Sequence, residues 1–290
     1  MTQGSRTGDG RRTSVWWEER PAPRRRAGGS VAQPEGLDRE RITATAVRML
    51  DVDGLARFSM RRLAAELGVT AMSVYWYVDS KDELLELALD AAQGELEEPG
   101  GAGGAEGAEG AGDWRPSLRA VAHDLRALLR RHPWIPALLG RCLNVGPRAM
   151  TYAAGVRGLL LRAGVPERQA DGALSALFSF VYGHGAVETG WDDRCRKAGL
   201  SPEECRRALR VRMRERPEYG ESAYGESVPV VGQRDGQDAR EREFAVALDC
   251  VIEGIRALTI AAAPAAPAAP AELSRTAVTP PAPPGCPARP

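Results

Sequence analysis

The segment 57–86 constrains the fold more than any other part of this chain. Ser59 can cap a helix, and the apolar residues behind it follow the i, i+3, i+4, i+7 spacing of one helical face: Met60, Leu63, Ala64 and Leu67. Gly68 tolerates the left-handed conformation that ends such a helix, and Thr70 can cap the next one. The segment therefore predicts two short helices joined by a tight turn.

The second of these helices, over 71–78, has little to bury. Its inward face needs only Val74 and Val78, so packing alone explains the helix poorly. The outer residues are left for another use: Ala71, Met72, Ser73, Tyr75 and Tyr77. A helix-turn-helix accounts for this pattern, because its second helix is supported by the first and presents its outer face to the major groove of DNA.

The run from Leu67 to Leu85 resembles the DNA-binding domain of the tetracycline repressor (TetR) family. In that family a recognition helix with Tyr-Trp-His/Tyr-Val leads into a capped helix that carries a lysine. Here the matching residues are Tyr-Trp-Tyr-Val at 75–78 and Ser-Lys-Asp-Glu at 80–83, and the match extends back to Leu37. With the capping Thr70, the positions that the resemblance assigns to DNA contact are Arg61, Thr70, Ala71, Met72, Ser73, Tyr75, Trp76, Tyr77 and Lys81.

The polar members of this set have chemistry that suits DNA. Arg61 could contact a phosphate or a guanine edge, and Ser73 a base or a phosphate. The hydroxyls of Tyr75 and Tyr77 suit phosphate oxygens. Lys81, at a helix N-terminus, can hold a phosphate together with free backbone N–H groups.

The other members are less specific. Ala71 and Met72 offer only apolar contact, for example to a thymine methyl, which departs from the amide-bearing form of this helix. The indole of Trp76 could donate to a phosphate or pack beneath the helix, and the sequence leaves both open.

The composition suits a soluble cytoplasmic protein. The 290 residues contain no apolar run near the about 18 to 20 residues of a membrane span, and no apolar stretch follows the N-terminal arginines as in a secretory signal. The five scattered cysteines form no C-x-x-C pair, which fits a reducing cytoplasm. A net charge of zero does not exclude DNA binding, because phosphate contact depends on local charge. The bases of the first domain lie around the predicted helix-turn-helix: Arg39, Arg41, Arg48, Arg57, Arg61, Arg62 and Lys81.

The chain divides by composition. We expect a disordered extension over 1–36, a DNA-binding domain over 37–98, a Gly/Ala/Glu linker over 99–112, an effector domain over 113–260 with a long loop at 217–240, and a disordered Ala/Pro tail over 261–290. Within the extension, the basic run 23–26 could track DNA as an arm or remain a solvated tail. In the first domain, we expect a helix over 37–52 that ends at Gly54. Ser80 and Glu83 form a capping box for a helix that runs to about Glu97.

The second domain is helical throughout, and no strand pattern occurs, so the predicted fold class is all-α. Stretches at 132–135 and 178–185 resemble the ligand-sensing, dimer-forming half of tetracycline repressors, which implies an effector pocket and a homodimer. We expect 168–189 and 241–260 to pair with their symmetry mates in a four-helix interface. The residues proposed for a mainly apolar pocket are Trp134, Asn144, Phe178, Tyr182, His184 and Glu188.

His184 and Glu188 have an i, i+4 spacing able to grip a metal, but no third ligand is evident, so a satisfied histidine is the simpler interpretation and no metal or cofactor is predicted. We find no nucleophile motif, phosphate loop or carboxylate pair of an enzyme. The sequence thus predicts a ligand-released repressor that binds double-stranded operator DNA as a homodimer and responds to a hydrophobic small molecule. The alternative is a helical small-molecule-binding protein or enzyme whose helix-turn-helix is only structural.

Overall fold

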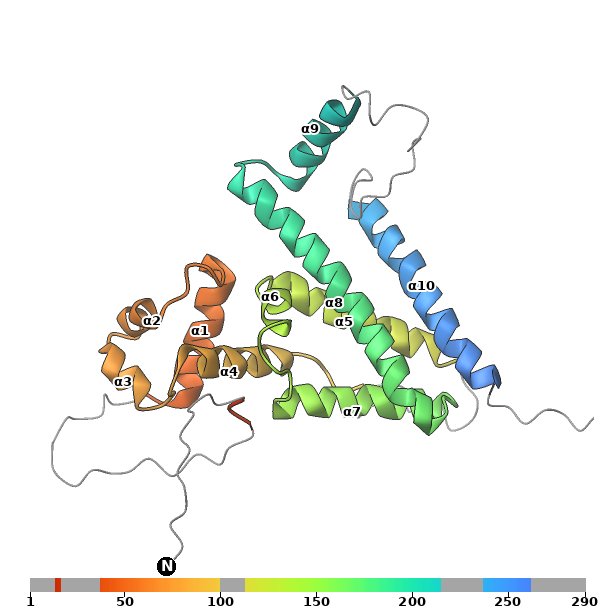
Figure 1. Cartoon of the computed structure of the whole chain (residues 1–290), viewed down its shortest axis with the longest axis horizontal. Coiled ribbons are helices and arrows are strands. Elements are labelled where there is room, and N and C mark those ends of the chain that lie inside the picture. Colours follow the sequence, from red (N-terminus) through yellow and green to blue (C-terminus); the bar gives the residue numbers. More distant parts are fainter. Residues whose placement is uncertain (1–13, 17–36, 100–112, 215–236, 262–290) are drawn as a thin grey trace, which may run out of the picture.

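The computed structural model describes residues 14–16, 37–99, 113–214 and 237–261 (Figure 1). These ranges contain ten α-helices and no strand, so the predicted all-α class is confirmed. Four helices form the first domain: α1 (Arg39–Asp53), α2 (Met60–Glu66), α3 (Ala71–Tyr75) and α4 (Lys81–Gln93). Six form the second: α5 (Arg115–Arg131), α6 (Ile135–Leu139), α7 (Pro147–Arg162), α8 (Glu167–Lys197), α9 (Pro202–Arg214) and α10 (Gln237–Ala261).

Side-chain caps begin each of the first four helices, as their sequence predicts for α2, α3 and α4. The side chains of Ser59, Thr70 and Ser80 accept hydrogen bonds from backbone N–H groups three residues ahead. Asp38 does the same for α1. The turn between α2 and α3 lies at Gly68, whose φ of 71° is left-handed as expected.

The capping box at α4 differs from the reciprocal form that Ser80 and Glu83 predict. The Ser80 hydroxyl accepts from the Glu83 N–H at 3.0 Å, but the Glu83 carboxylate accepts from the Asp79 N–H at 2.6 Å. Its other oxygen pairs with Arg39 at 2.7 Å. The carboxylate therefore ties the start of α4 to α1.

Three predicted boundaries need correction. Helix α4 ends at Gln93 and not near Glu97: Gly94 is its C-cap, and the N–H groups of Gly94, Glu95 and Leu96 bond to carbonyls three residues back, which tightens the chain into a turn. Helix α10 begins at Gln237, inside the loop predicted over 217–240, and its first turns contact α5 through Glu241.

The third correction concerns the extension predicted to be disordered. Ser14 is buried, its hydroxyl donates to Glu86 of α4 at 2.8 Å, and the Val15 N–H donates to the same oxygen at 2.9 Å. A buried carboxylate without a partner is costly, so Glu86 favours this docking. The rest of the extension, including the basic run 23–26, lies outside the described residues, as do all of the predicted linker but Pro99 and all of the predicted tail but Ala261.

One hydrophobic core runs through both domains. Helix α4 lies centrally between α1 on one side and α6 and α7 on the other. In the second domain, α5, α7 and α10 pack against the long helix α8, and Figure 1 shows α8 and α10 lying side by side. Motion of the second domain can therefore reach the first through α4.

Candidate nucleic-acid interface and its link to the second domain

Helix α3 has the division between inner and outer faces that a recognition helix needs. Val74 and Val78 are fully buried. Met72 is 69 % exposed, Tyr75 42 % and Trp76 57 %. The indole of Trp76 therefore does not pack beneath the helix, and its contact with a phosphate stays a prediction.

Other residues of the predicted contact set are less available. Ala71 and Tyr77 are partly buried and pack against the core. The Thr70 hydroxyl accepts from the Ser73 N–H at 3.2 Å, and the two hydroxyl oxygens lie 2.9 Å apart. Thr70 and Ser73 are therefore engaged in holding the start of α3.

The basic residues around the helix-turn-helix are less free than the sequence suggests. Arg39 pairs with Glu83, and Arg62 pairs with Asp53 at 2.6 Å. Lys81, expected to hold a phosphate, donates to the Phe58 carbonyl oxygen at 2.9 Å, and its ammonium lies 5.6 Å from the centre of the Phe58 ring. The ammonium thus ties α4 to the loop before α2, and a phosphate contact would have to share it.

Two arginines of α2 and the loop before it complete the candidate interface. Arg57 and Arg61 are both exposed. Arg61 lies in the first turn of α2, the position expected for a phosphate or guanine contact. The candidate interface thus combines Arg57 and Arg61 with the exposed tip of α3.

Two polar side chains of α4 connect this domain to α7. Asp90 is 5 % exposed, and one of its oxygens accepts from the N–H groups of Arg148 at 2.9 Å and Ala149 at 3.2 Å, at the N-terminus of α7. Gln93 donates to the Asn144 side-chain oxygen at 2.7 Å. Buried polar residues repeat at helical spacing along α4: Glu83, Glu86, Asp90 and Gln93. This pattern is visible in the sequence and indicates polar partners on other helices, but the predicted sites did not include it.

A second connection lies at α1. One oxygen of Asp51 accepts from Nε1 of Trp134 at 2.7 Å and lies 2.7 Å from Nδ1 of His132, whose Nε2 lies 3.1 Å from Glu95. Trp134 was predicted to line the effector pocket. It is buried against the DNA-binding domain instead, because its indole N–H finds its acceptor on α1.

Three of the predicted pocket residues do lie together. The Phe178 ring stacks on Tyr152 at 6.2 Å between centroids and meets Tyr182 edge-on at 6.0 Å. Burial raises the pKa of Tyr182 to about 12, although a hydrogen bond with Asn144 acts in the opposite direction. Because Asn144 also accepts from Gln93, a polar chain leads from this aromatic cluster to α4.

The other two predicted pocket residues lie in a separate cluster. The His184 ring packs on Phe244 at 5.0 Å between centroids, and its Nε2 lies 3.4 Å from Glu188. Arg126 donates to both Glu188 oxygens, at 2.6 and 3.1 Å, and lies 4.3 Å above the Phe244 ring. Burial alone would raise the pKa of Glu188, but hydrogen bonds from His184 and Arg126 outweigh it and lower that pKa to about 2.

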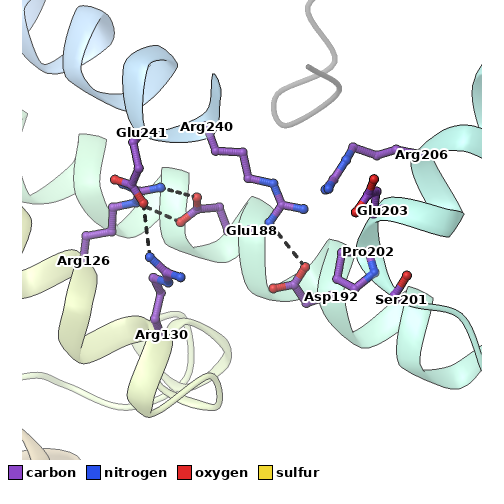
Figure 2. Close-up of a pocket in the computed structure, with 10 residues that line it drawn as sticks. All are labelled: Arg126, Arg130, Glu188, Asp192, Ser201, Pro202, Glu203, Arg206, Arg240 and Glu241. Carbon is purple, nitrogen blue, oxygen red and sulfur yellow. Dashed lines mark hydrogen bonds and ion pairs between the residues drawn. The ribbon is translucent and has the colours of Figure 1, made fainter. Parts of the chain in front are cut away.

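A cavity of about 340 Å³ lies beside this cluster, between α5, α8, α9 and α10 (Figure 2). Its lining is polar, unlike the mainly apolar pocket expected from the sequence: Arg126, Arg130, Glu188, Asp192, Ser201, Pro202, Glu203, Arg206, Arg240 and Glu241. Sequence reasoning missed these arginines because they resemble solvated bases of helix surfaces. Only the packing of α9 and α10 turns them inward.

Within the described ranges, no three His, Cys, Asp or Glu side chains are grouped to hold a metal ion. The same ranges contain no helix with the length and apolar character that crossing a membrane requires.

Known proteins match both halves of the chain. A family model of bacterial regulatory proteins of the TetR family matches residues 42–88, and one of the tetracyclin repressor-like C-terminal domain matches residues 106–259. The HTH-type transcriptional repressor DrrR1 of Streptomyces coeruleorubidus is 34 % identical over 208 residues, 71 % of this chain and 72 % of that protein.

A transcriptional regulator of Saccharopolyspora erythraea is 35 % identical over 155 residues, 53 % of this chain, which spans only 62 % of that relative. The fold also matches a solved structure, that of the TetR family protein ActR of Streptomyces coelicolor in complex with actinorhodin. Its TM-score is 0.61 at 26 % identity, over 77 % of this chain and 98 % of ActR. With both of its domains matched, the chain belongs to the TetR family of bacterial transcriptional regulators.

Proposed function

We propose that the protein is a homodimeric repressor that binds a palindromic operator in double-stranded DNA and releases it when a small molecule binds. The observation that carries this proposal is the exposed tip of α3, where Met72, Tyr75 and Trp76 face solvent above a minimal buried face. Exposed apolar and aromatic side chains on a supported short helix suit insertion into a major groove. The relative DrrR1 bears the name of a repressor, and ActR was solved with actinorhodin bound, which supports both parts of the proposal.

Action by binding, and not by catalysis, is supported by the regulator class of the relatives. The alternative of a small-molecule-binding protein or enzyme with a purely structural helix-turn-helix finds no support in them. A repressor of chromosomal operators would work in the cytoplasm, where the DNA is.

The proposed dimer uses α8 and α10. Along α8, small residues with open space or solvent beside them repeat at helical spacing: Gly172, Ser175, Ser179, Gly183 and Gly190. Val187 on the same helix is 48 % exposed, and Val246 of α10 is 66 % exposed. Two exposed helix faces of this kind support a four-helix interface with a second copy. Ile255, in contrast, is buried within its own protomer and cannot report on the dimer.

The release mechanism would pass through α4. A ligand that displaces α7 or α8 pulls on Asp90 and Gln93 through the N-terminus of α7 and Asn144. It shifts the population toward a spacing of the two recognition helices that no longer fits half-sites about 34 to 36 Å apart. The ligand must bind that conformation more tightly than the DNA-bound one.

The test is a fluorescence anisotropy titration of the full chain with DNA flanking its own gene. Arg61→Gln should weaken binding to every sequence and reduce the slope of log K against log salt by about 0.9, one phosphate contact. Tyr75→Phe, which removes a single hydroxyl, should weaken binding roughly 2- to 13-fold. The control is Met150→Ala, a change on an exposed residue of α7 in the other domain, which should leave binding unchanged. Equal affinity of all four proteins would refute α3 and Arg61 as the contact surface.

A further inference from the structure

The cavity between α5, α8, α9 and α10 contains two guanidinium groups, of Arg206 and Arg240, with nitrogen atoms that make no hydrogen bond within the described residues. Arg206 of α9 is only 5 % exposed, and neither its Nε nor its Nη1 has a hydrogen-bond partner in the part of the chain that the structure describes. In Figure 2 the Arg206 side chain points into the cavity, toward the guanidinium of Arg240, which extends from α10. Two guanidinium groups that face each other without an acceptor between them are unfavourable.

The other charges of the cavity do not relieve this arrangement. Arg126 and Arg130 form a closed set with Glu188 and Glu241. Of the remaining acids, Glu203 is largely exposed and lies 3.6 Å from Arg207 on its own helix.

Asp192 is the remaining acid beside the two arginines. Its Oδ1 lies 3.7 Å from Nη1 of Arg240 and makes no hydrogen bond. One carboxylate at that distance cannot satisfy both guanidiniums. The pair formed by Arg206 and Arg240 therefore retains a local positive charge in a cavity that is open to solvent on one side.

We propose that Arg206 and Arg240 bind the carboxylate or phosphate group of a small-molecule effector. Guanidinium groups hold such oxyanions by charge-assisted hydrogen bonds, and Nε and Nη1 of Arg206 are two donors that have no partner in the described part of the chain. The cavity, at about 340 Å³, has the size of a small-ligand site. The effector is then an anion, and not the purely hydrophobic molecule that the sequence suggests.

A ligand bound at this site would also connect two helices of the second domain. An oxyanion between the two arginines joins α9 and α10 next to α8, the helix that carries the aromatic residues Phe178 and Tyr182. The inference rests on the proposed function only in calling the ligand an effector. Binding of an oxyanion can be measured without DNA.

The experiment uses thermal unfolding of the full-length protein in three arms: benzoate, its neutral isostere benzamide, and inorganic phosphate. We expect benzoate or phosphate at millimolar concentration to raise the unfolding temperature by a few degrees, and benzamide to have no effect. Benzoate without phosphate identifies a carboxylate site, and the reverse a phosphate site. If neither anion raises the unfolding temperature, the proposal is wrong.

Two variants assign the site. Arg206→Met and Arg240→Met should each weaken anion binding roughly ten- to a hundredfold, the loss of a charge-assisted hydrogen-bonded contact. Arg207→Met, on the exposed side of the same helix, is the matched control and should retain the response. Asp192→Asn should strengthen binding, because it removes the competing carboxylate.

Without ligand, Arg206→Met should be at least as stable as the wild-type protein, since a buried charge without a partner is removed. A fall in stability together with an unchanged anion response would mean that Arg206 has a structural partner, and would overturn the proposal. Operator binding is measured separately. A protein that binds the anions but no operator would refute the proposed function and leave the anion site standing.

Discussion

Replacing Arg126 with Met would test the ion-pair network that joins α5, α8 and α10. The Arg126 side chain is 4 % exposed, and that of its partner Glu188 is 11 % exposed. Arg126 also pairs with Glu241, but Glu241 keeps a second partner in Arg130 at 3.2 Å. The main effect of the change is therefore to leave the Glu188 carboxylate buried without its guanidinium.

The magnitude follows from that burial. Removing one partner of a buried ion pair costs about 3 to 5 kcal/mol, because the remaining charge stays desolvated. For a protein of this size that cost corresponds to a fall of roughly 6 to 20 °C in unfolding temperature. Arg119 provides the matched control: it lies on the same helix and pairs with Asp249, but its side chain is 40 % exposed. Arg119→Met should cost no more than about 1 kcal/mol.

The loss of stability caused by Arg126→Met should depend on pH. In the wild-type protein the pKa of Glu188 is lowered from 4.5 to about 2, so its stabilising contribution is present above pH 4.5 and is lost as the pH falls toward 2. Arg126→Met removes one of the interactions that lower this pKa, so the carboxyl takes up a proton at a higher pH than in the wild type. The difference in unfolding free energy between the two proteins should therefore shrink from pH 7 to pH 4.

Urea unfolding at several pH values, followed by circular dichroism, measures this difference. The double variant Arg126→Met/Glu188→Leu should recover most of the lost stability, because no buried charge remains. A loss as small as that of Arg119→Met at pH 7 would refute the reasoning. So would a loss that is the same at pH 7 and pH 4.

Two further predictions concern the dimer and the joint between the domains. Val187→Glu should produce monomers in sedimentation velocity and weaken operator binding by roughly 100-fold or more, because a monomer loses avidity. The control Val211→Glu changes a similarly exposed residue of α9 and should do neither. If Val187→Glu is still a dimer, the interface lies elsewhere. Asp51→Ala leaves the buried indole N–H of Trp134 without its acceptor and removes the contact of Asp51 with His132, so it should cost about 1 to 3 kcal/mol in calorimetry. The control Asp53→Ala breaks an exposed pair and should cost less than about 1 kcal/mol; equal losses would contradict the buried role of Asp51.

The sequence alone determined the helix-turn-helix. Ser59, Thr70 and Ser80 cap helices, and Gly68 forms a turn, through contacts that reach no more than four residues along the chain. Val74 and Val78 were predicted to be buried from spacing alone. Such features depend on local geometry, so the order of residues is enough to reveal them. The resemblance to the TetR family was readable for the same reason.

The tertiary structure decided which polar residues of the second domain meet. Asn144 reaches Gln93, Trp134 reaches Asp51, and Arg126 reaches Glu241, across 51, 83 and 115 residues of the chain. Each of these side chains could equally have faced water, because a polar residue on an amphipathic helix has no periodicity that marks a distant partner. Likewise, Arg206 and Arg240 come to face one cavity only because α9 and α10 both pack beside α8. Helix packing, and not local sequence, sets the distance between two charges.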